Sequence, residues 1–170
     1  MNMDFYTAET SDITLNYYIS ASELIQSASP AFPEIPLTPG FIGFTFASKS
    51  FDMETGQFKN AFVKPIASID NVDLFEIITT TGRSFKLSPN QPVVCVQSDI
   101  FKDENLLDTY YDLSIASGLD ETCSIVINQG DTYIIEGISA INYIGKDKGY
   151  YILSSDNSFV LSNGLVLLNY

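Results

Sequence analysis

The chain has 170 residues, 45% of them hydrophobic, which indicates a folded globule of about one domain and argues against a disordered chain. Its 21 acidic and 8 basic residues give a net charge of −13, which argues against nucleic acid and anionic membrane as partners. The sequence has no apolar run of membrane-spanning length and no secretory leader. We therefore expect the protein in the cytoplasm or in a virion.

Residues 1–40 are expected to form a short irregular or partly helical N-terminal arm with a proline-rich end. The serine, alanine and glutamate residues that begin at Ser20 favour one short helix. Prolines follow at a density that argues against regular structure, at Pro30, Pro33, Pro36 and Pro39. Such a segment is suited to contact a neighbouring protein, because its backbone is already extended.

Residues 41–96 predict the first part of a mostly β domain that extends from residue 41 to residue 170. Branched and aromatic side chains recur there in short runs, as is typical of strands. Glycine-containing turns are predicted at residues 54–56 and at Thr81 and Gly82, and the second of these is a hairpin signal.

The second half of the chain consists of an acidic segment followed by a second strand-rich segment. Residues 97–122 are the most acidic and least strand-like part, and we expect a helical turn and a loop there. The strand pattern returns in residues 123–170, with predicted turns at residues 146–149 and at Asn163 and Gly164.

A short phrase occurs twice: Ser-Phe-Lys-Leu-Ser at residues 84–88 and Ser-Phe-Val-Leu-Ser at residues 158–162. The segments that end in these phrases begin at Ile66 and Gly137, and both predict a strand, a turn, a long strand, a tight turn and a strand. The repeat indicates two related β-subunits, about residues 41–96 and 123–170, packed as a pseudo-twofold pair.

The stretch "SKSFDMETGQFKNAFVKPI" (residues 48–66) predicts a strand, a Glu-Thr-Gly turn and a strand. The stretches "LFEIITTTGRSFKLSPNQPVV" (residues 74–94) and "GYYILSSDNSFVLSNGLVLLN" (residues 149–169) contain the two copies of the phrase. The three stretches resemble the N-terminal, second and terminal sequence blocks of the Hint family, the module shared by inteins and the autoprocessing part of Hedgehog proteins. The resemblance covers residues 41–169 and implies a Hint-like pseudo-twofold β-fold.

The resemblance also implies where catalytic residues would stand, and this chain differs there. Hint domains use an N-terminal cysteine or serine to attack the preceding peptide carbonyl, assisted by a histidine in the second block. At that block Ser88 stands for the usual threonine and Gln91 for the histidine. Asn157 stands for a later histidine and Leu168 for the histidine before the terminal asparagine. The asparagine that cyclises in inteins is retained as Asn169.

The whole chain contains no histidine, so every imidazole acid or base of the family is missing. A positioned proton-transfer group contributes on the order of 10²–10⁴ in rate. Glutamine forms hydrogen bonds but does not accept a proton, and leucine does neither. A serine such as Ser11 or Ser20 could serve as nucleophile, but nothing in the sequence marks either one. We therefore expect an inactive scaffold with no catalytic residues, and slow self-processing at Asn169 is the alternative.

The sequence predicts no metal site and no cofactor. Cys95 and Cys123 lack the spacing of a zinc or redox motif, and Cys95 lies in a predicted strand as a small buried residue. The acidic residues of the middle segment lack the pattern of a calcium loop, so a solvated acidic face is favoured over a calcium site; they are Asp99, Asp103, Glu104, Asp108 and Asp112.

These observations predict a non-catalytic structural or assembly protein with protein partners, among them copies of itself, and without nucleic-acid or membrane partners. A virion component, such as part of a phage tail or neck, is the specific expectation. Besides self-processing at Asn169, a second alternative is an acidic binding module for a basic protein.

Overall fold

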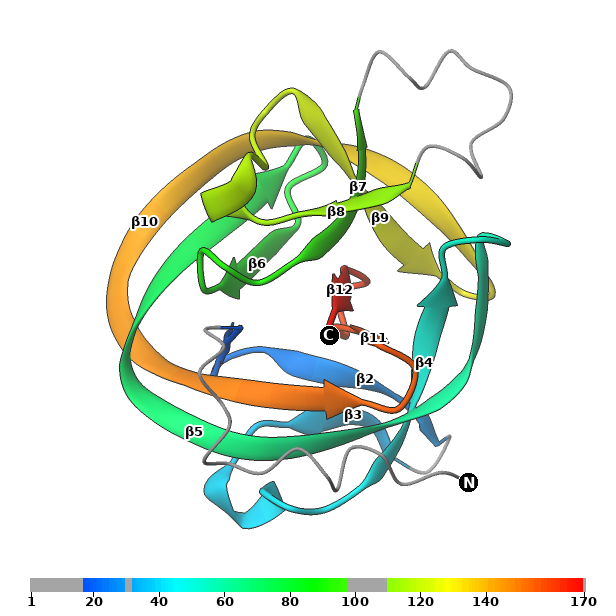
Figure 1. Cartoon of the computed structure of the whole chain (residues 1–170), viewed down its shortest axis with the longest axis vertical. Helices are drawn as coiled ribbons and strands as arrows, with labels where there is room; N and C mark the ends of the chain where they lie inside the picture. The colour runs from blue at the N-terminus through cyan, green and yellow to red at the C-terminus, as the bar shows by residue number, and fades with distance from the viewer. Residues whose placement is uncertain (1–16, 30–31, 98–109, 170) are drawn as a thin grey trace.

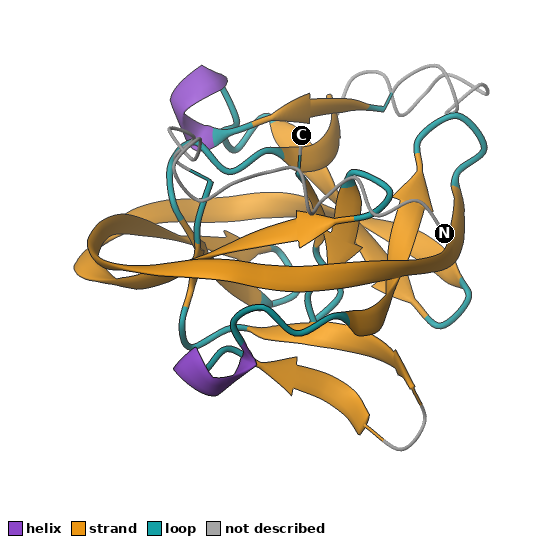
Figure 2. Ribbon diagram, turned by 60° about the horizontal axis from the view of Figure 1, so that its bottom comes forward, coloured by secondary structure: helices purple, strands orange, loops and turns teal. Residues whose placement is uncertain are grey.

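The structure is a computed structural model that describes residues 17–29, 32–97 and 110–169. These residues form twelve strands of one antiparallel sheet and two single turns of 3-10 helix (Figures 1 and 2). In chain order the elements are β1 (Ile19–Ser20), β2 (Leu24–Ser29), β3 (Phe32–Pro36), η3 (Pro39–Phe41), β4 (Phe46–Asp52), β5 (Gln57–Thr79), β6 (Ser84–Leu87), β7 (Val93–Gln97), β8 (Tyr111–Leu113), η6 (Ile115–Ser117), β9 (Cys123–Gln129), β10 (Thr132–Ser154), β11 (Ser158–Val160) and β12 (Val166–Leu168).

The two longest strands, β5 and β10, curve around the molecule side by side and pair with each other (Figure 1). The order of strands in the sheet is β11-β12-β7-β9-β10-β1-β6-β5-β4-β2-β3, with β8 beside β7. Among the described residues no helix is long and apolar enough to cross a membrane.

The predicted duplication is visible in these two strands. Both bounds of β10 lie 75 residues beyond those of β5, from 57 to 132 and from 79 to 154. The pairing of the two strands follows the same relation. Thr79 pairs with Ile138, and the residues 75 positions after Thr79 and 75 positions before Ile138, which are Ser154 and Val63, also pair with each other. The mostly β, pseudo-twofold fold class is therefore confirmed.

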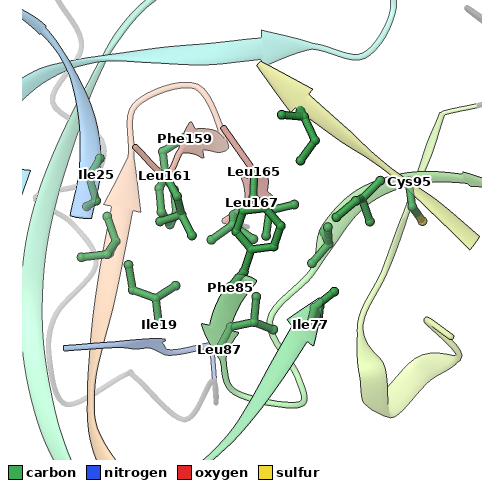
Figure 3. Packing of buried hydrophobic residues seen from close by; sticks show 14 of the residues in the cluster. Ile19, Ile25, Ile77, Phe85, Leu87, Cys95, Phe159, Leu161, Leu165 and Leu167 are labelled. Carbon is green, nitrogen blue, oxygen red and sulfur yellow. The ribbon is translucent and has the colours of Figure 1, made fainter. Parts of the chain in front are cut away.

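The repeated phrase supplies equivalent parts of one core (Figure 3). Phe85 and Leu87 from the first copy, and Phe159 and Leu161 from the second, are at most 1% exposed and belong to the same hydrophobic cluster. Alternation along a strand directs every second side chain to one face, so Ser-Phe-x-Leu-Ser delivers two apolar groups to the core. Each copy therefore buries its pair in the same core, which explains why the phrase occurs twice.

The turn predicted at residues 146–149 is wrong, because β10 runs through it as a strand. This part of β10 pairs with β5, and Lys146 lies 3.4 Å from Asp73 across the ladder. Gly149 serves a close approach: a Cβ atom there would lie 2.9 Å from the Cβ of Tyr18. The turns predicted around Gly56, Gly82 and Gly164 are confirmed as hairpin connections.

The helix expected after Ser20 is also wrong, and so is the irregular proline region. Most of the segment is a hairpin of β2 and β3, in which the fully buried Ile25 and Ile35 face each other. Pro33 and Pro36 fit a strand because β3 is the last strand of the sheet, where a missing N–H leaves no ladder bond unmade. Helical structure in the described part of residues 1–40 is limited to η3, and Pro30 lies outside the described residues.

Of the acidic middle segment, residues 98–109 lie outside the described part, and with them Asp99, Asp103, Glu104 and Asp108. The expected helical turn is present as η6, where Ser114 and Ser117 form a reciprocal capping box. The predicted divisions of the chain at residues 40, 96 and 122 stay predictions. β1, from the expected arm, pairs with β6 and β10 of the later part.

Candidate functional site

The residues that the sequence resemblance assigns to catalytic positions meet where the turn after β6 approaches the C-terminal strand. Ser88 and Gln91 lie in the turn between β6 and β7, and each is 2% exposed. The backbone N–H of Gln91 donates to the oxygen of Ser88 at 3.1 Å, which closes this turn. The turn presents both side chains to the interior.

Ser88 contacts the beginning of the described chain. Its Oγ accepts a hydrogen bond of 2.9 Å from the backbone N–H of Tyr18, and its own N–H donates to the oxygen of Tyr18 at 2.8 Å. The peptide nitrogen and the carbonyl of Tyr18 are therefore both fixed by one residue of the second block.

Gln91 contacts the end of the chain. Its side-chain Nε2 donates to the backbone oxygen of Leu168 at 2.7 Å and to that of Pro92 at 3.0 Å. The N–H of Leu168 in turn donates to the oxygen of Pro92 at 3.0 Å. Leu168 directs an aliphatic side chain, 3% exposed, into a second hydrophobic cluster.

Asn169 is 4% exposed and is fixed by its backbone and its side chain. Its N–H donates to the oxygen of Asn157 at 2.8 Å, and Asn157 adopts a φ of 66° in the turn between β10 and β11. Its Oδ1 accepts from the N–H of Ser154 at 3.3 Å, and its side chain also bonds the hydroxyl of Tyr151. All the residues predicted for the site are thus linked in one network, which is buried except at Asn157, where it reaches the surface.

No protein-family model matches the sequence, and no curated protein matches it. Solved intein structures match it closely in shape. The Ssp DnaB mini-intein variant M86 superposes with a TM-score of 0.72 at 15% identity, over 93% of this chain and 98% of that one. The DnaB intein from Synechocystis sp. PCC 6803 gives 0.73 at 15% identity, over 91% and 99%. The DnaX mini intein from Spirulina platensis gives 0.61 at 16% identity, over 89% and 99%.

The chain folds as a Hint-like domain. The expectation drawn from the three sequence blocks is therefore confirmed for the fold, and the shape agrees over about nine tenths of the chain. At these identities the comparison concerns the fold, so the chemistry of this Hint-like domain has to be judged from its own side chains.

Those side chains are neutral. Hydroxyl, amide, aliphatic and backbone groups make the contacts described above for Tyr18, Gln91, Leu168 and Asn169. The titratable side chain in contact with Asn169 is Tyr151. Burial raises the pKa of Tyr151 above its ordinary value of 10, as do the neighbouring Tyr17 and Tyr18, although the bond from Asn169 opposes them. Tyr151 is therefore a neutral phenol at physiological pH.

Tyr18 is the residue that sequence reasoning missed. In this Hint-like domain the backbone of Tyr18 bonds Ser88 of the second block, and its Cβ carries a phenol ring, not a thiol or hydroxyl that could attack the preceding carbonyl. The phenolic oxygen of a tyrosine lies on the far side of its ring and does not reach that carbonyl. The signal was present in the strand-like run Tyr17, Tyr18 and Ile19, which was assigned to an irregular arm.

The serines considered as nucleophiles are not brought to this place. Ser20 lies two residues beyond Tyr18, 5% exposed, and its Oγ bonds Ser22, at 2.8 Å to the hydroxyl and 3.2 Å to the N–H. Ser11 lies outside the described residues.

Two hollows flank the network. One, of about 370 Å³, is lined partly by Tyr18 and Ser88, and the other, of about 390 Å³, partly by Asn157 and Leu168. Within the part of the chain that the structure describes, no group of three or more histidine, cysteine, aspartate or glutamate side chains could hold a metal ion.

Proposed function

We propose that this protein is a non-catalytic structural or assembly protein built on a Hint-like fold. The proposal requires that the site no longer moves protons or forms an acyl intermediate. It also requires that the residues at the catalytic positions have a structural role instead.

The observation that carries the proposal is the contact between Gln91 and Leu168. At two positions where the family has histidines, this chain has a buried amide and a buried aliphatic side chain, and the amide bonds the backbone oxygen of Leu168 at 2.7 Å. Both hydrogens of that amide have an acceptor, Leu168 or Pro92. A carboxamide in this arrangement ties β12 to the turn before β7 and does not act as an acid or base near neutral pH.

The kind of assembly stays a prediction. A virion component, such as part of a phage tail or neck, remains our specific proposal, and it depends on the sequence-based expectation alone. The alternative of an acidic module for a basic protein also stays a prediction, and salt-sensitive association with a basic partner would test it.

One observation favours the alternative of slow self-processing. The carboxamide of Asn169 is fixed on two sides, by the N–H of Ser154 and by Tyr151, as a reacting amide would need to be. Against this, each missing proton-transfer group lowers the rate by about 10²–10⁴. We therefore place the non-catalytic function first.

The experiment is the intact mass of the full chain with a tag before Met1 and a short foreign extension after Tyr170, incubated for days at neutral and mildly acidic pH. We expect the mass to stay unchanged. Loss of the extension after Asn169 would contradict the proposal if Asn169→Ala abolishes it and Asn142→Ala, at an exposed asparagine of β10, does not. Loss that is equal in both variants would identify a contaminating protease and leave the proposal standing.

A further inference from the structure

Five large apolar side chains are exposed among the described residues, and three of them lie in the middle of the ribbon that β5 and β10 form. Ile69 is 41% exposed, Tyr143 55% and Ile144 44%. We call these three residues the ribbon patch. Exposed apolar side chains that gather on one element and are rimmed by charges are typical of a protein interface.

Two members of the ribbon patch, Tyr143 and Ile69, are connected across the surface through Asp73. The hydroxyl of Tyr143 donates to Oδ1 of Asp73 at 2.9 Å, and the ring of Tyr143 packs on Phe75 with centroids 5.3 Å apart. Asp73 and Ile69 line the same hollow of about 370 Å³, together with Val72. The surface therefore runs from Tyr143 through Asp73 to Ile69.

The pseudo-twofold relation includes the ribbon patch. Ile69 and Ile144 are 75 residues apart, the same shift that relates β5 to β10. Close to each isoleucine a residue adopts a positive φ, Asn71 at 62° and Gly145 at 97°. The two antiparallel strands thus each present an isoleucine at equivalent positions of the ribbon. A second copy rotated by 180° would meet the same arrangement of side chains.

The charges of the ribbon differ from those of the chain as a whole. Residues 66–75 and 142–149 contain three aspartates and two lysines, a net charge of −1, whereas the whole chain carries −13. Lys146 lies 3.4 Å from Asp73 and Lys148 lies 3.8 Å from Asp70. Two copies of an acidic chain repel each other least where the local charge is near zero and both signs are present.

From these observations we propose that the ribbon patch is the contact surface of a twofold dimer of this chain. Each copy would cover the isoleucines of the other, and the lysines of one copy would face the aspartates of the other. The inference goes beyond the proposed function, because dimerisation does not depend on whether Asn169 reacts.

The first test is sedimentation of the full chain over a range of concentrations. We expect a concentration-dependent dimer, and in Ile144→Glu a dissociation constant at least about tenfold higher, because a charge would be placed in the contact. Phe44→Glu is the matched control, since Phe44 is 61% exposed but lies outside the ribbon. We expect it to dimerise like the unchanged chain.

A charge exchange makes the test specific for this face. One variant carries Asp70→Lys and Asp73→Lys, and the other Lys146→Asp and Lys148→Asp. Each alone should be monomeric, because like charges would meet, and an equimolar mixture should dimerise. Circular dichroism verifies that both variants are folded. A monomer at every concentration of the unchanged chain, a dimer that only Phe44→Glu weakens, or no dimer in the mixture would each overturn the proposal.

Discussion

The side-chain nitrogen of Gln91 lies 2.7 Å from the backbone oxygen of Leu168 and donates a hydrogen bond to it in the interior of the protein. The bond joins two segments 77 residues apart in the chain, the second block and the last described strand. Gln91 thus fastens the C-terminal strand to the body of the fold.

Replacing Gln91 with alanine should therefore lower stability. The oxygens of Leu168 and Pro92 would each lose a hydrogen-bond donor in a buried place, and we expect the free energy of unfolding to fall by about 1–3 kcal/mol. Urea denaturation measures this. Asn90→Ala, in the same turn, is the control and should change stability by less than about 0.5 kcal/mol. Equal losses of stability in both variants would show that the hydrogen bond between Gln91 and Leu168 does not account for the loss.

Gly164 should be far less replaceable than Gly130, although both have a positive φ, 103° and 65°. A Cβ atom at Gly164 would lie 2.6 Å from Cγ2 of Ile127 and 2.9 Å from the oxygen of Asn128, whereas at Gly130 it would meet nothing within 4 Å. We expect Gly164→Ala to cost about 2–4 kcal/mol and Gly130→Ala about 1 kcal/mol. Thermal melts of the two variants, taken side by side, test the difference.

Arg83 should stabilise the fold through Glu136, whose side chain is 4% exposed and 2.8 Å from the Arg83 Nε. Burial of Glu136 acts to raise its pKa, but the bonds from Thr81 and Arg83 outweigh burial and lower the pKa below 4.5. We expect Arg83→Gln to cost about 2–3 kcal/mol near neutral pH, because it leaves a buried carboxylate short of partners. Lys59→Gln, at an exposed lysine of β5, should change little.

The pH dependence of this loss follows from the sign of the shift. A carboxyl group whose pKa is lowered by folding stabilises the fold above its unfolded pKa, and this contribution disappears as pH falls through the folded pKa. The difference between the unchanged chain and Arg83→Gln should therefore be full at neutral pH and shrink below about pH 4. A difference that is constant with pH would indicate that Arg83 acts by packing instead.

Cys95 should be unreactive in the folded protein. Burial raises the pKa of the Cys95 thiol to about 12, and Cys123 nearby adds to the rise. Because the thiolate is the reactive form, iodoacetamide at neutral pH should leave Cys95 unmodified until the protein is unfolded in urea. Peptide mass spectrometry locates the modification. Rapid labelling of Cys95 without denaturant would contradict its assignment as a buried hydrophobic residue.

The fold could be predicted from the sequence because its strongest signals are long-range repeats. The copies ending at Ser88 and Ser162 indicated two equivalent β-subunits, and their apolar residues Phe85 and Phe159 lie in one core. The second and terminal blocks also placed Gln91, Leu168 and Asn169, which the structure brings together. The repeat could be recognised because it depends on burial, which the order of apolar residues records directly, whereas the site residues were placed by the resemblance to the Hint family.

The predictions were wrong where the local composition favoured turns or irregular structure but the segment pairs with a distant strand. Residues 146–149 have turn chemistry, but fourteen residues of β10 pair with β5, and the ladder absorbs the irregular positions as bulges. The proline-rich stretch forms a strand because it lies at the edge of the sheet, where the missing N–H of proline costs no ladder hydrogen bond. The sequence alone does not show which strand lies at the edge. Tyr18 was missed for the same reason, since its role depends on contact with Ser88, 70 residues away.

The matched lengths of β5 and β10 have a consequence for how this chain can change over time. A residue inserted into one strand would shift its side chains to the opposite face beyond that point, and the shift would spread along the partner strand as well. Such an insertion survives only where the extra residue is extruded, as at Ile144, or where its counterpart 75 positions away lengthens too. We therefore expect β5 and β10 to keep matching lengths even where their sequences differ.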